Sequence, residues 1–412
     1  MRWSSALAIS RQHVKALEAG STEAAAAAEA LYRLAHVNAA DRDAIADAGA
    51  IPPLVALLTN GTADGRDWAA AALAHLAFHN AARQAAITNA GAIDPLVALL
   101  TNGAASGQEQ AARALRNLAW RNAANQAAII EAGAIAPLVA LLTNGTADGQ
   151  EQAAVALSNL AWNTANKVAI REAGAIPPLV ALLTNGRAGG QKWAALAFRN
   201  LAARNAANEA AIAEAGAIPP LVALVTNGAA GGQEHAAAAL RCLAFHLPSK
   251  DAIREAGGIA PLVALVRDGA AGGQEHALFA LGTLAWNNAA NKVAIAEAGA
   301  VDPLVALARD AGGRLKATAV KKVLEELDPA ALAWALRHRK RRDYPLLLAA
   351  GATIPPGADD AYLRKVAAAG GFPTYEKAHR QALDALAAKA FPCLPTEVAA
   401  QVVSFAFHVG YY

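Results

Sequence analysis

Residues 90–103 read AGAIDPLVALLTNG, and close variants of this stretch recur along most of the 412-residue chain. The first glycine of each copy stands at Gly49, Gly91, Gly133, Gly174, Gly216, Gly257 and Gly299. Successive copies are therefore 41 or 42 residues apart. Self-similarity at this period is typical of solenoids, in which each unit packs only against its neighbours. The repeat predicts a long binding surface rather than a catalytic pocket.

Composition and charge exclude several other kinds of protein. The net charge of +3 is too small for the concentrated Lys/Arg stripe of a nucleic-acid-binding face. The two cysteines, Cys242 and Cys393, form no disulfide framework. Gly, Pro and Asn interrupt every apolar run before the roughly 20 residues that a membrane span requires. We therefore expect a monomeric, cytoplasmic or nuclear protein that binds no nucleic acid and inserts into no membrane.

Each period contains three predicted helices, as the copy quoted above illustrates. Residues 80–89 form a short first helix, and a glycine supplies the corner after it. Pro95 opens a second helix, where its missing N–H costs nothing. A third helix over residues 108–122 follows, with Ser106 or Gly107 as its cap. Both shorter periods lose one residue between a third helix and the next first helix, which leaves the helices intact.

Two segments of the repeat, GAIPPLVALL (residues 174–183) and ALRNLA (residues 114–119), resemble the armadillo repeat when combined with three helices per period. The resemblance implies an all-α fold, a right-handed superhelical α-solenoid of about seven three-helix repeats. We expect an N-terminal helical cap at residues 1–19, the repeat array at 20–327 and an irregular helical extension at 328–412. The chain is most similar to plant U-box-type and vacuolar armadillo scaffolds, without their accessory segments.

The resemblance also implies where a ligand binds. In armadillo proteins the third helices line a concave groove, and an asparagine in each helix can hold the backbone of an extended peptide. The amide group offers both a donor and an acceptor, so it pairs with any peptide unit. This position holds Asn117, Asn159 and Asn200 in three consecutive repeats, and Arg33, His75, Cys242 and Thr283 elsewhere. We therefore predict a peptide clamp in the middle of the array only.

Aromatic residues recur at two fixed offsets from the asparagine position. Those three residues after it are Phe78, Trp120, Trp162, Phe245 and Trp286, and those seven residues before it are Trp68 and Trp193. Both offsets place the rings on the groove-facing stripe of a third helix. Two interpretations stay open, because the rings either anchor a partner or pack over the neighbouring repeat.

The remaining candidate residues are polar. Arg113, Arg121 and Arg204 outnumber the acidic residues of the same stripe, which favours a mildly acidic or phosphorylated protein or peptide as the ligand. His75 and His79 have the spacing of a metal-binding pair, but no further ligand is spaced to match. We therefore expect no metal and no cofactor, and assign His75 to the groove wall. No nucleophile–base pair, phosphate loop or HExxH motif is present, so the sequence predicts a non-enzymatic protein.

The C-terminal extension holds two motifs that each have two interpretations. The basic run from Arg337 to Arg342 is either a solvated helix end or a nuclear localisation signal. Residues 394–412 resemble the opening helix of an F-box through Leu394 and Pro395, which implies a Skp1-type adaptor of a ubiquitin ligase as partner. The same residues suit a cap over the last repeat. An interaction scaffold is the leading prediction, a substrate receptor of a ubiquitin ligase is the alternative, and a nuclear transport adaptor ranks below both.

Overall fold

The computed structural model describes residues 2–18, 23–310, 314–327, 332, 344–354 and 360–390, and all regular elements within these residues are helices. The chain divides into two compact units, Met1–Gly257 and Gly258–Tyr412. We call them the N-terminal and the C-terminal body. The division falls inside the sixth repeat, directly after the corner glycine of that repeat.

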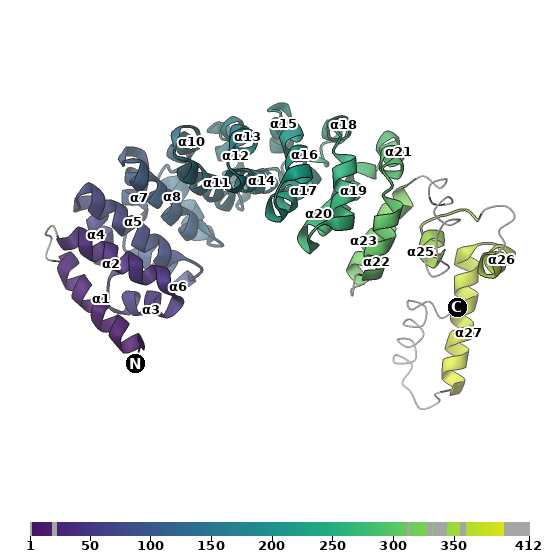
Figure 1. Ribbon diagram of the computed structural model, residues 1–412, viewed down its shortest axis with the longest axis horizontal. Coiled ribbons are helices and arrows are strands. Elements are labelled where there is room, and N and C mark those ends of the chain that lie inside the picture. Colours follow the sequence, from purple (N-terminus) through teal and green to yellow (C-terminus); the bar gives the residue numbers. More distant parts are fainter. Residues whose placement is uncertain are drawn as a thin grey trace. The chain divides into compact units, whose positions relative to one another are not determined.

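The described helices form seven three-helix repeats, preceded by α1 (Arg2–Glu18) and α2 (Glu23–Val37) (Figure 1). The first helices are α3 (Ala39–Asp47), α6 (Ala81–Asn89), α9 (Ala123–Glu131), α12 (Thr164–Glu172), α15 (Ala206–Glu214), α18 (Leu247–Glu255) and α21 (Ala289–Glu297). The second helices are α4 (Ile51–Asn60), α7 (Ile93–Asn102), α10 (Ile135–Asn144), α13 (Ile176–Asn185), α16 (Ile218–Asn227), α19 (Ile259–Asp268) and α22 (Val301–Asp310). The third helices are α5 (Ala63–Ala77), α8 (Ala105–Ala119), α11 (Ala147–Leu160), α14 (Ala188–Ala202), α17 (Ala230–Leu243), α20 (Ala271–Ala285) and α23 (Arg314–Glu326).

The first helix and the corner after it follow the sequence prediction. Asn80 caps α6, because its side-chain oxygen accepts a hydrogen bond from the backbone N–H of Arg83. The helix ends at Asn89, and Gly91 turns the chain with a φ of 80°. Asparagine and glycine recur at these two positions in most repeats, so the same local chemistry starts and ends each first helix.

The third helix differs from its prediction by three residues at both ends. α8 begins at Ala105 after the N-cap Ala104, and it ends at Ala119. Ser106 lies inside the helix, where its hydroxyl bonds to Asp67 of the preceding repeat. The predicted stop at residue 122 is wrong because Trp120 is already extended (ψ 114°) and Arg121 takes a φ of 53°. A left-handed residue cannot continue a right-handed helix.

The shortened periods are explained by that same left-handed residue. Non-glycine residues with positive φ follow the third helices α5, α8, α14 and α20, at His79, Arg121, Arg204 and Asn287. After α11 and α17, where the period is one residue shorter, none of the described residues has this conformation. The deletion therefore removes the residue with the strained backbone and leaves the helices on both sides intact, as the sequence predicts.

Two kinds of glycine bound the second helix, and they give a prediction about stability. Gly133 has a φ of 78° with open space around it, whereas a Cβ on Gly145 would lie 2.5 Å from the carbonyl oxygen of Leu141. We expect Gly133→Ala to lower the free energy of unfolding by about 1–2 kcal/mol through backbone strain. We expect Gly145→Ala to lower it by about 2–3 kcal/mol through overpacking.

Guanidinium chloride denaturation followed by circular dichroism measures both effects, with Gly133→Asn as a control that tolerates positive φ. Equal midpoints for both alanine variants and the wild type would contradict this account of the second helix.

Small side chains form the core between the third helices. In the N-terminal body these helices pack in chain order, α2 against α5, α5 against α8, α8 against α11, α11 against α14 and α14 against α17. The run Ala69–Ala74 of α5 is entirely buried, and Phe198 of α14 is among the few large side chains that are fully enclosed. Methyl-sized side chains let the helices approach closely, and burial of this apolar surface drives the stacking.

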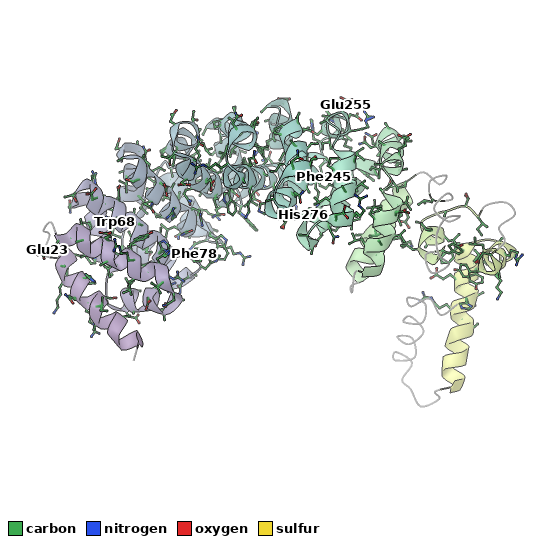
Figure 2. The ribbon with its side chains drawn as sticks, viewed as in Figure 1. Glu23, Trp68, Phe78, Phe245, Glu255 and His276 are labelled. Carbon is green, nitrogen blue, oxygen red and sulfur yellow. The ribbon has the colours of Figure 1, made fainter. Side chains whose placement is uncertain are left out.

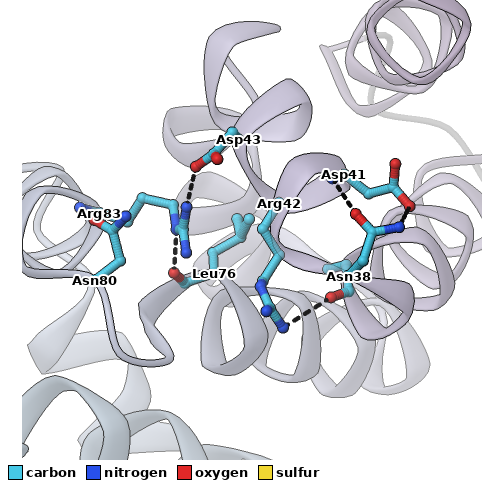
Figure 3. Close-up of polar contacts among 8 residues, drawn as sticks. Asn38, Asp41, Arg42, Asp43, Leu76, Asn80 and Arg83 are labelled. Carbon is cyan, nitrogen blue, oxygen red and sulfur yellow. Dashed lines mark hydrogen bonds and ion pairs between the residues drawn. The ribbon is translucent and has the colours of Figure 1, made fainter. Parts of the chain in front are cut away.

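Polar side chains of the first helices fix each repeat to the one before it (Figure 3). Arg83 forms an ion pair with Asp43 of the preceding first helix, and its Nε donates to the carbonyl oxygen of Leu76 at 2.6 Å. Carbonyls in the last turn of a helix have no partner within the helix, so such donors satisfy them. Asparagine does the same in later repeats, where Asn125, Asn166 and Asn208 donate to Leu118, Leu160 and Leu201.

The C-terminal body continues the repeats and then departs from them. α20 packs against α19 and α23, and α22 packs against α23. Helices α25 (Tyr344–Ala349) and α26 (Ala361–Ala368) both contact α27 (Phe372–Ala390), and Tyr362 of α26 is buried. Among the described helices none alone is long and apolar enough to cross a membrane, although two bent pairs, α9 with α10 and α15 with α16, have the length and composition together.

Candidate functional site

The third helices of the N-terminal body carry most of the candidate residues. We call the side of α5, α8, α11, α14 and α17 that bears the asparagine position the third-helix face. Because these helices pack side by side in chain order, equivalent residues form rows that cross them. The rows formed by the asparagines, the aromatic residues and the cations lie in very different surroundings.

The asparagine row is largely buried and bonds to the preceding repeat. Asn117, Asn159 and Asn200 are only 7%, 8% and 9% exposed. Their Nδ2 atoms donate to the carbonyl oxygens of Ala74 (2.8 Å), Arg116 (3.0 Å) and Ser158 (3.0 Å). Each acceptor lies in the last turn of the preceding third helix, which otherwise leaves such carbonyls unpaired. These amides thus tie successive third helices together, a role that the sequence reasoning missed.

The side-chain oxygens of these asparagines are only partly engaged in hydrogen bonds. The Oδ1 of Asn117 accepts a hydrogen bond from Arg116 Nε at 3.2 Å. No group in the part of the chain that the structure describes donates to the Oδ1 of Asn159 or Asn200. The peptide clamp therefore stays a prediction, with the free carbonyl oxygens of Asn159 and Asn200 as its remaining hydrogen-bonding groups.

The aromatic row lies at the ends of the third helices rather than on them. Phe78 and Trp120 are the first residues after α5 and α8, and Trp162 and Phe245 come one residue later. The prediction that these four rings lie on the groove-facing stripe of a third helix is therefore wrong. Trp162 and Phe245 are 65% and 62% exposed, and Phe78 is exposed to a lesser degree. In the C-terminal body Trp286 is likewise exposed, at the end of α20.

Trp120 differs from the other members of the aromatic row. It is half-buried, with its ring centroid 4.0 Å from that of His79 and the guanidinium of Arg121 4.7 Å from it. Packing is thus the observed environment of Trp120. The rings of Trp162 and Phe245 have large exposed surfaces instead.

The two earlier tryptophans lie on the third helices, near the start of each. Trp68 on α5 packs against Tyr32 of α2, with ring centroids 5.3 Å apart. Figure 2 shows Trp68 beside α2, and Phe78 just beyond the end of α5. Trp193 on α14 is half-buried, and the ammonium group of Lys192 lies 4.4 Å from its ring centroid. Both rings therefore line the third-helix face while part of each is packed.

Positive charge on the third-helix face is only partly neutralised. Arg113 forms an ion pair with Glu109 at 2.8 Å. Arg116 donates to Gln152 at 2.7 Å instead of to a carboxylate. Among the described residues no carboxylate pairs with the side chains of Arg116, Lys192, Arg199 or Arg204. The face therefore carries an excess of unpaired cations over α8 and α14.

His75 lies near the first of these cations, Arg116. Its pKa is lowered to about 4, first by burial and then by the positive charges of His36, Arg113, Arg42 and Arg116. His75 is therefore neutral near pH 7. Within the described residues no group of three or more His, Cys, Asp or Glu side chains is arranged to hold a metal ion.

The two C-terminal motifs lie outside the described residues. The basic run from Arg337 to Arg342 and the F-box-like residues 394–412 both belong to segments on which the structure carries no information. The nuclear localisation signal and the Skp1-type adaptor therefore stay predictions.

Comparison with known proteins settles the family. A family model described as the Armadillo/beta-catenin-like repeat matches residues 38–78, 79–120, 122–162, 163–203 and 205–245, which together make up half of the chain. The matched segments coincide with the first five three-helix repeats. The chain belongs to the armadillo repeat family. Its all-α solenoid fold, predicted from the repeat, is confirmed.

Solved structures support the same assignment. An engineered protein from the Northeast Structural Genomics Consortium is 30% identical with a TM-score of 0.75, and the similarity covers 97% of this chain and 98% of that one. A designed armadillo repeat protein is 30% identical with a TM-score of 0.54, over 57% of this chain and 99% of that one. Another, in complex with the peptide (KR)4, is 28% identical with a TM-score of 0.53, over 57% and 99%. No curated protein matches the sequence.

As an armadillo repeat protein, the chain is a protein-interaction scaffold, of a family whose members are generally non-enzymatic. The finer similarity to plant U-box-type armadillo proteins remains a prediction.

Proposed function

We propose that the third-helix face binds an extended acidic segment of a partner protein. The observation that carries this proposal is the set of cations on the face without a carboxylate partner, at Arg116, Lys192, Arg199 and Arg204. Partly buried charges attract a complementary ligand more strongly than fully solvated charges, because they are screened less. An acidic peptide would supply carboxylate partners for these four side chains.

The exposed rings supply the second part of the proposed interface. Trp162 and Phe245 present broad apolar surfaces within the N-terminal body. Aromatic residues with this exposure act as anchors at many protein interfaces, since they bury much apolar area at a low cost in conformational entropy. The free Oδ1 atoms of Asn159 and Asn200 would accept hydrogen bonds from the backbone of the bound segment.

The designed neighbour that binds (KR)4 sharpens the expected charge of the ligand. That protein was solved in complex with a basic peptide. On the chain described here the unpaired side chains of the equivalent helices are themselves basic, so we propose a ligand of opposite sign. We further propose that the protein is a monomer in the cytoplasm or nucleus. A ubiquitin-ligase receptor and a transport adaptor stay alternatives that the described residues do not address.

Fluorescence anisotropy with labelled (DE)4, (KR)4 and the neutral control (NQ)4 tests this proposal. We expect (DE)4 to bind at least about tenfold more tightly than the other two, with an affinity that falls as salt is added. Equal affinity for all three peptides, or a preference for (KR)4, would overturn the acidic ligand.

A further inference from the structure

Four rings from two helices form a cluster at the N-terminal end of the third-helix face. Tyr32 and His36 of α2 lie against Trp68 and His75 of α5. Tyr32 is central, with its ring centroid 5.3 Å from those of both Trp68 and His75, and His36 is 5.1 Å from His75. None of the four side chains is fully buried, so the cluster is accessible from solvent.

The cluster offers hydrogen-bond donors that the described protein does not use. The hydroxyl group of Tyr32 and the indole N–H of Trp68 bond to no group among the described residues. Tyrosine and tryptophan usually find a partner for this polar group when they are packed. Here both rings are held by their neighbours while their donors stay open to a ligand. The two imidazoles add further ring nitrogens to the same place.

Positive charge lies near the His75 side of the cluster. The guanidinium of Arg42 of α3 donates to the carbonyl oxygen of Ala35 and lies 5.8 Å from the ring centroid of Phe78, and its buried Nε has no hydrogen-bond partner among the described groups. Arg116 of α8 donates to neutral oxygens of Asn117 and Gln152. Both guanidinium groups lie close enough to His75 to lower its pKa. The site therefore combines free donors with cations that no carboxylate neutralises.

Most carboxylates near the cluster are already engaged. On α2, α5 and α8, Glu29 pairs with Arg33, Asp67 accepts from Ser106, and Glu109 pairs with Arg113. On α3, Asp41 bonds to Asn38, and Asp43 pairs with Arg83 of α6. The other charged side chains of these packed helices are Glu23 on α2, Asp47 on α3, and Asp64 and Arg66 on α5. None of these acids is among the groups that act on His75. An external acceptor would meet donors and cations without displacing an internal carboxylate.

We propose that Tyr32, Trp68, His36 and His75, with Arg42 and Arg116, form a subsite for the carboxylate or phosphate group of a side chain of the bound peptide. The chemistry fits because such a group has several acceptor oxygens, while the Tyr32 hydroxyl, the Trp68 indole and the two guanidinium groups can all donate to it. The subsite rests on the proposed peptide binding and adds a fixed point that sets the register of the peptide.

The titration of His75 supplies an independent signature. Burial and the nearby cations hold its pKa at about 4 in the free protein. A bound anion favours the protonated imidazole, so it raises this pKa. By linkage, the complex takes up a proton as the pH falls toward the raised pKa, and anion affinity rises in the same direction. A merely structural ring cluster would not move the pKa of His75 when an anion is added.

The test uses the full chain and three probes: inorganic phosphate, (DE)4, and a peptide of the same length that alternates serine and phosphoserine. NMR follows the His75 imidazole and the Trp68 indole N–H, and anisotropy gives affinities. We expect the pKa of His75 to rise with the peptide that supplies the true ligand group. We expect Tyr32→Phe with Trp68→Phe, which keeps an aromatic ring at both positions and removes both donors, to lose about tenfold in affinity. Tyr375→Phe on α27 is the matched control, with no expected change.

The outcomes separate the subsite from the peptide-binding face. The subsite is overturned if a peptide binds the double variant as tightly as the wild type and leaves the pKa of His75 unchanged. The peptide-binding face is overturned, and the subsite supported, if inorganic phosphate raises the pKa of His75 while neither peptide binds. Both are overturned if no probe acts. The relative effect of (DE)4 and the phosphopeptide then identifies carboxylate or phosphate as the group.

Discussion

Replacing Arg199 and Arg204 by glutamate is expected to weaken binding of (DE)4 about 100-fold, at about 1.4 kcal/mol for each substitution. Neither side chain has a carboxylate partner among the described residues, so their loss breaks no ion pair within the protein. Arg204 follows the end of α14 and is exposed, while Arg199 is half-buried on α14. The double variant should therefore fold normally and lose affinity because attraction to the acidic peptide is replaced by repulsion.

A matched control separates local charge from total charge. Arg187→Glu with Arg267→Glu makes the same change in net charge at exposed sites, at the start of α14 and at the end of α19. Anisotropy with (DE)4 should give near wild-type affinity for the control. If control and test variants weaken binding equally, long-range attraction and not the third-helix face accounts for the affinity.

Asn159→Ala is expected to lower mainly the stability of the protein, whereas Trp162→Ala is expected to lower mainly its affinity for the acidic peptide. Asn159→Ala removes the donor to the carbonyl oxygen of Arg116, in a largely buried interface. Its cost should be about 1–3 kcal/mol of unfolding free energy. Trp162 is exposed, so Trp162→Ala should change stability by less than about 0.5 kcal/mol. It should lower affinity for the acidic peptide about 30-fold, the size of a hot-spot effect.

Guanidinium chloride denaturation and anisotropy, corrected for the folded fraction, give the two quantities for each variant. Val168→Ala on α12 is the control, since it truncates another exposed apolar side chain away from the face. The aromatic row is packing if Trp162→Ala lowers the midpoint markedly and leaves the affinity of the folded protein unchanged.

The periodic features of the fold were predictable because each depends on a few neighbouring residues. The corner glycine and the proline of the second helix recur in all seven copies, and the capping asparagine recurs in every copy except the sixth, where His246 takes its place. The boundaries of the third helix were harder to predict from the sequence. Its N-cap is the weakly informative Ala104 in one repeat and a side-chain cap, Thr146, in another.

The site was predictable only in part, because the same residue type can serve two roles. The amide of Asn159 suits a peptide backbone and the end of a neighbouring helix equally, and only the structure shows the bond to Arg116. Tyr32 was missed because it lies one residue before the asparagine position (Arg33 in α2), which the predicted groove-facing stripe did not include. The division after Gly257 was not predicted, although the corner there differs from the other copies by Gly258 in place of an alanine.

A peptide on the third-helix face can be detected in one NMR spectrum, because the protein has two sets of asparagine side chains in different places. Asn117, Asn159 and Asn200 lie on that face, whereas Asn125, Asn166 and Asn208 are buried on the first helices. We predict that adding (DE)4 to the ¹⁵N-labelled protein shifts the side-chain amide signals of the first set and the indole signal of Trp162, and leaves the second set unchanged. Shifts confined to the first helices would contradict the account.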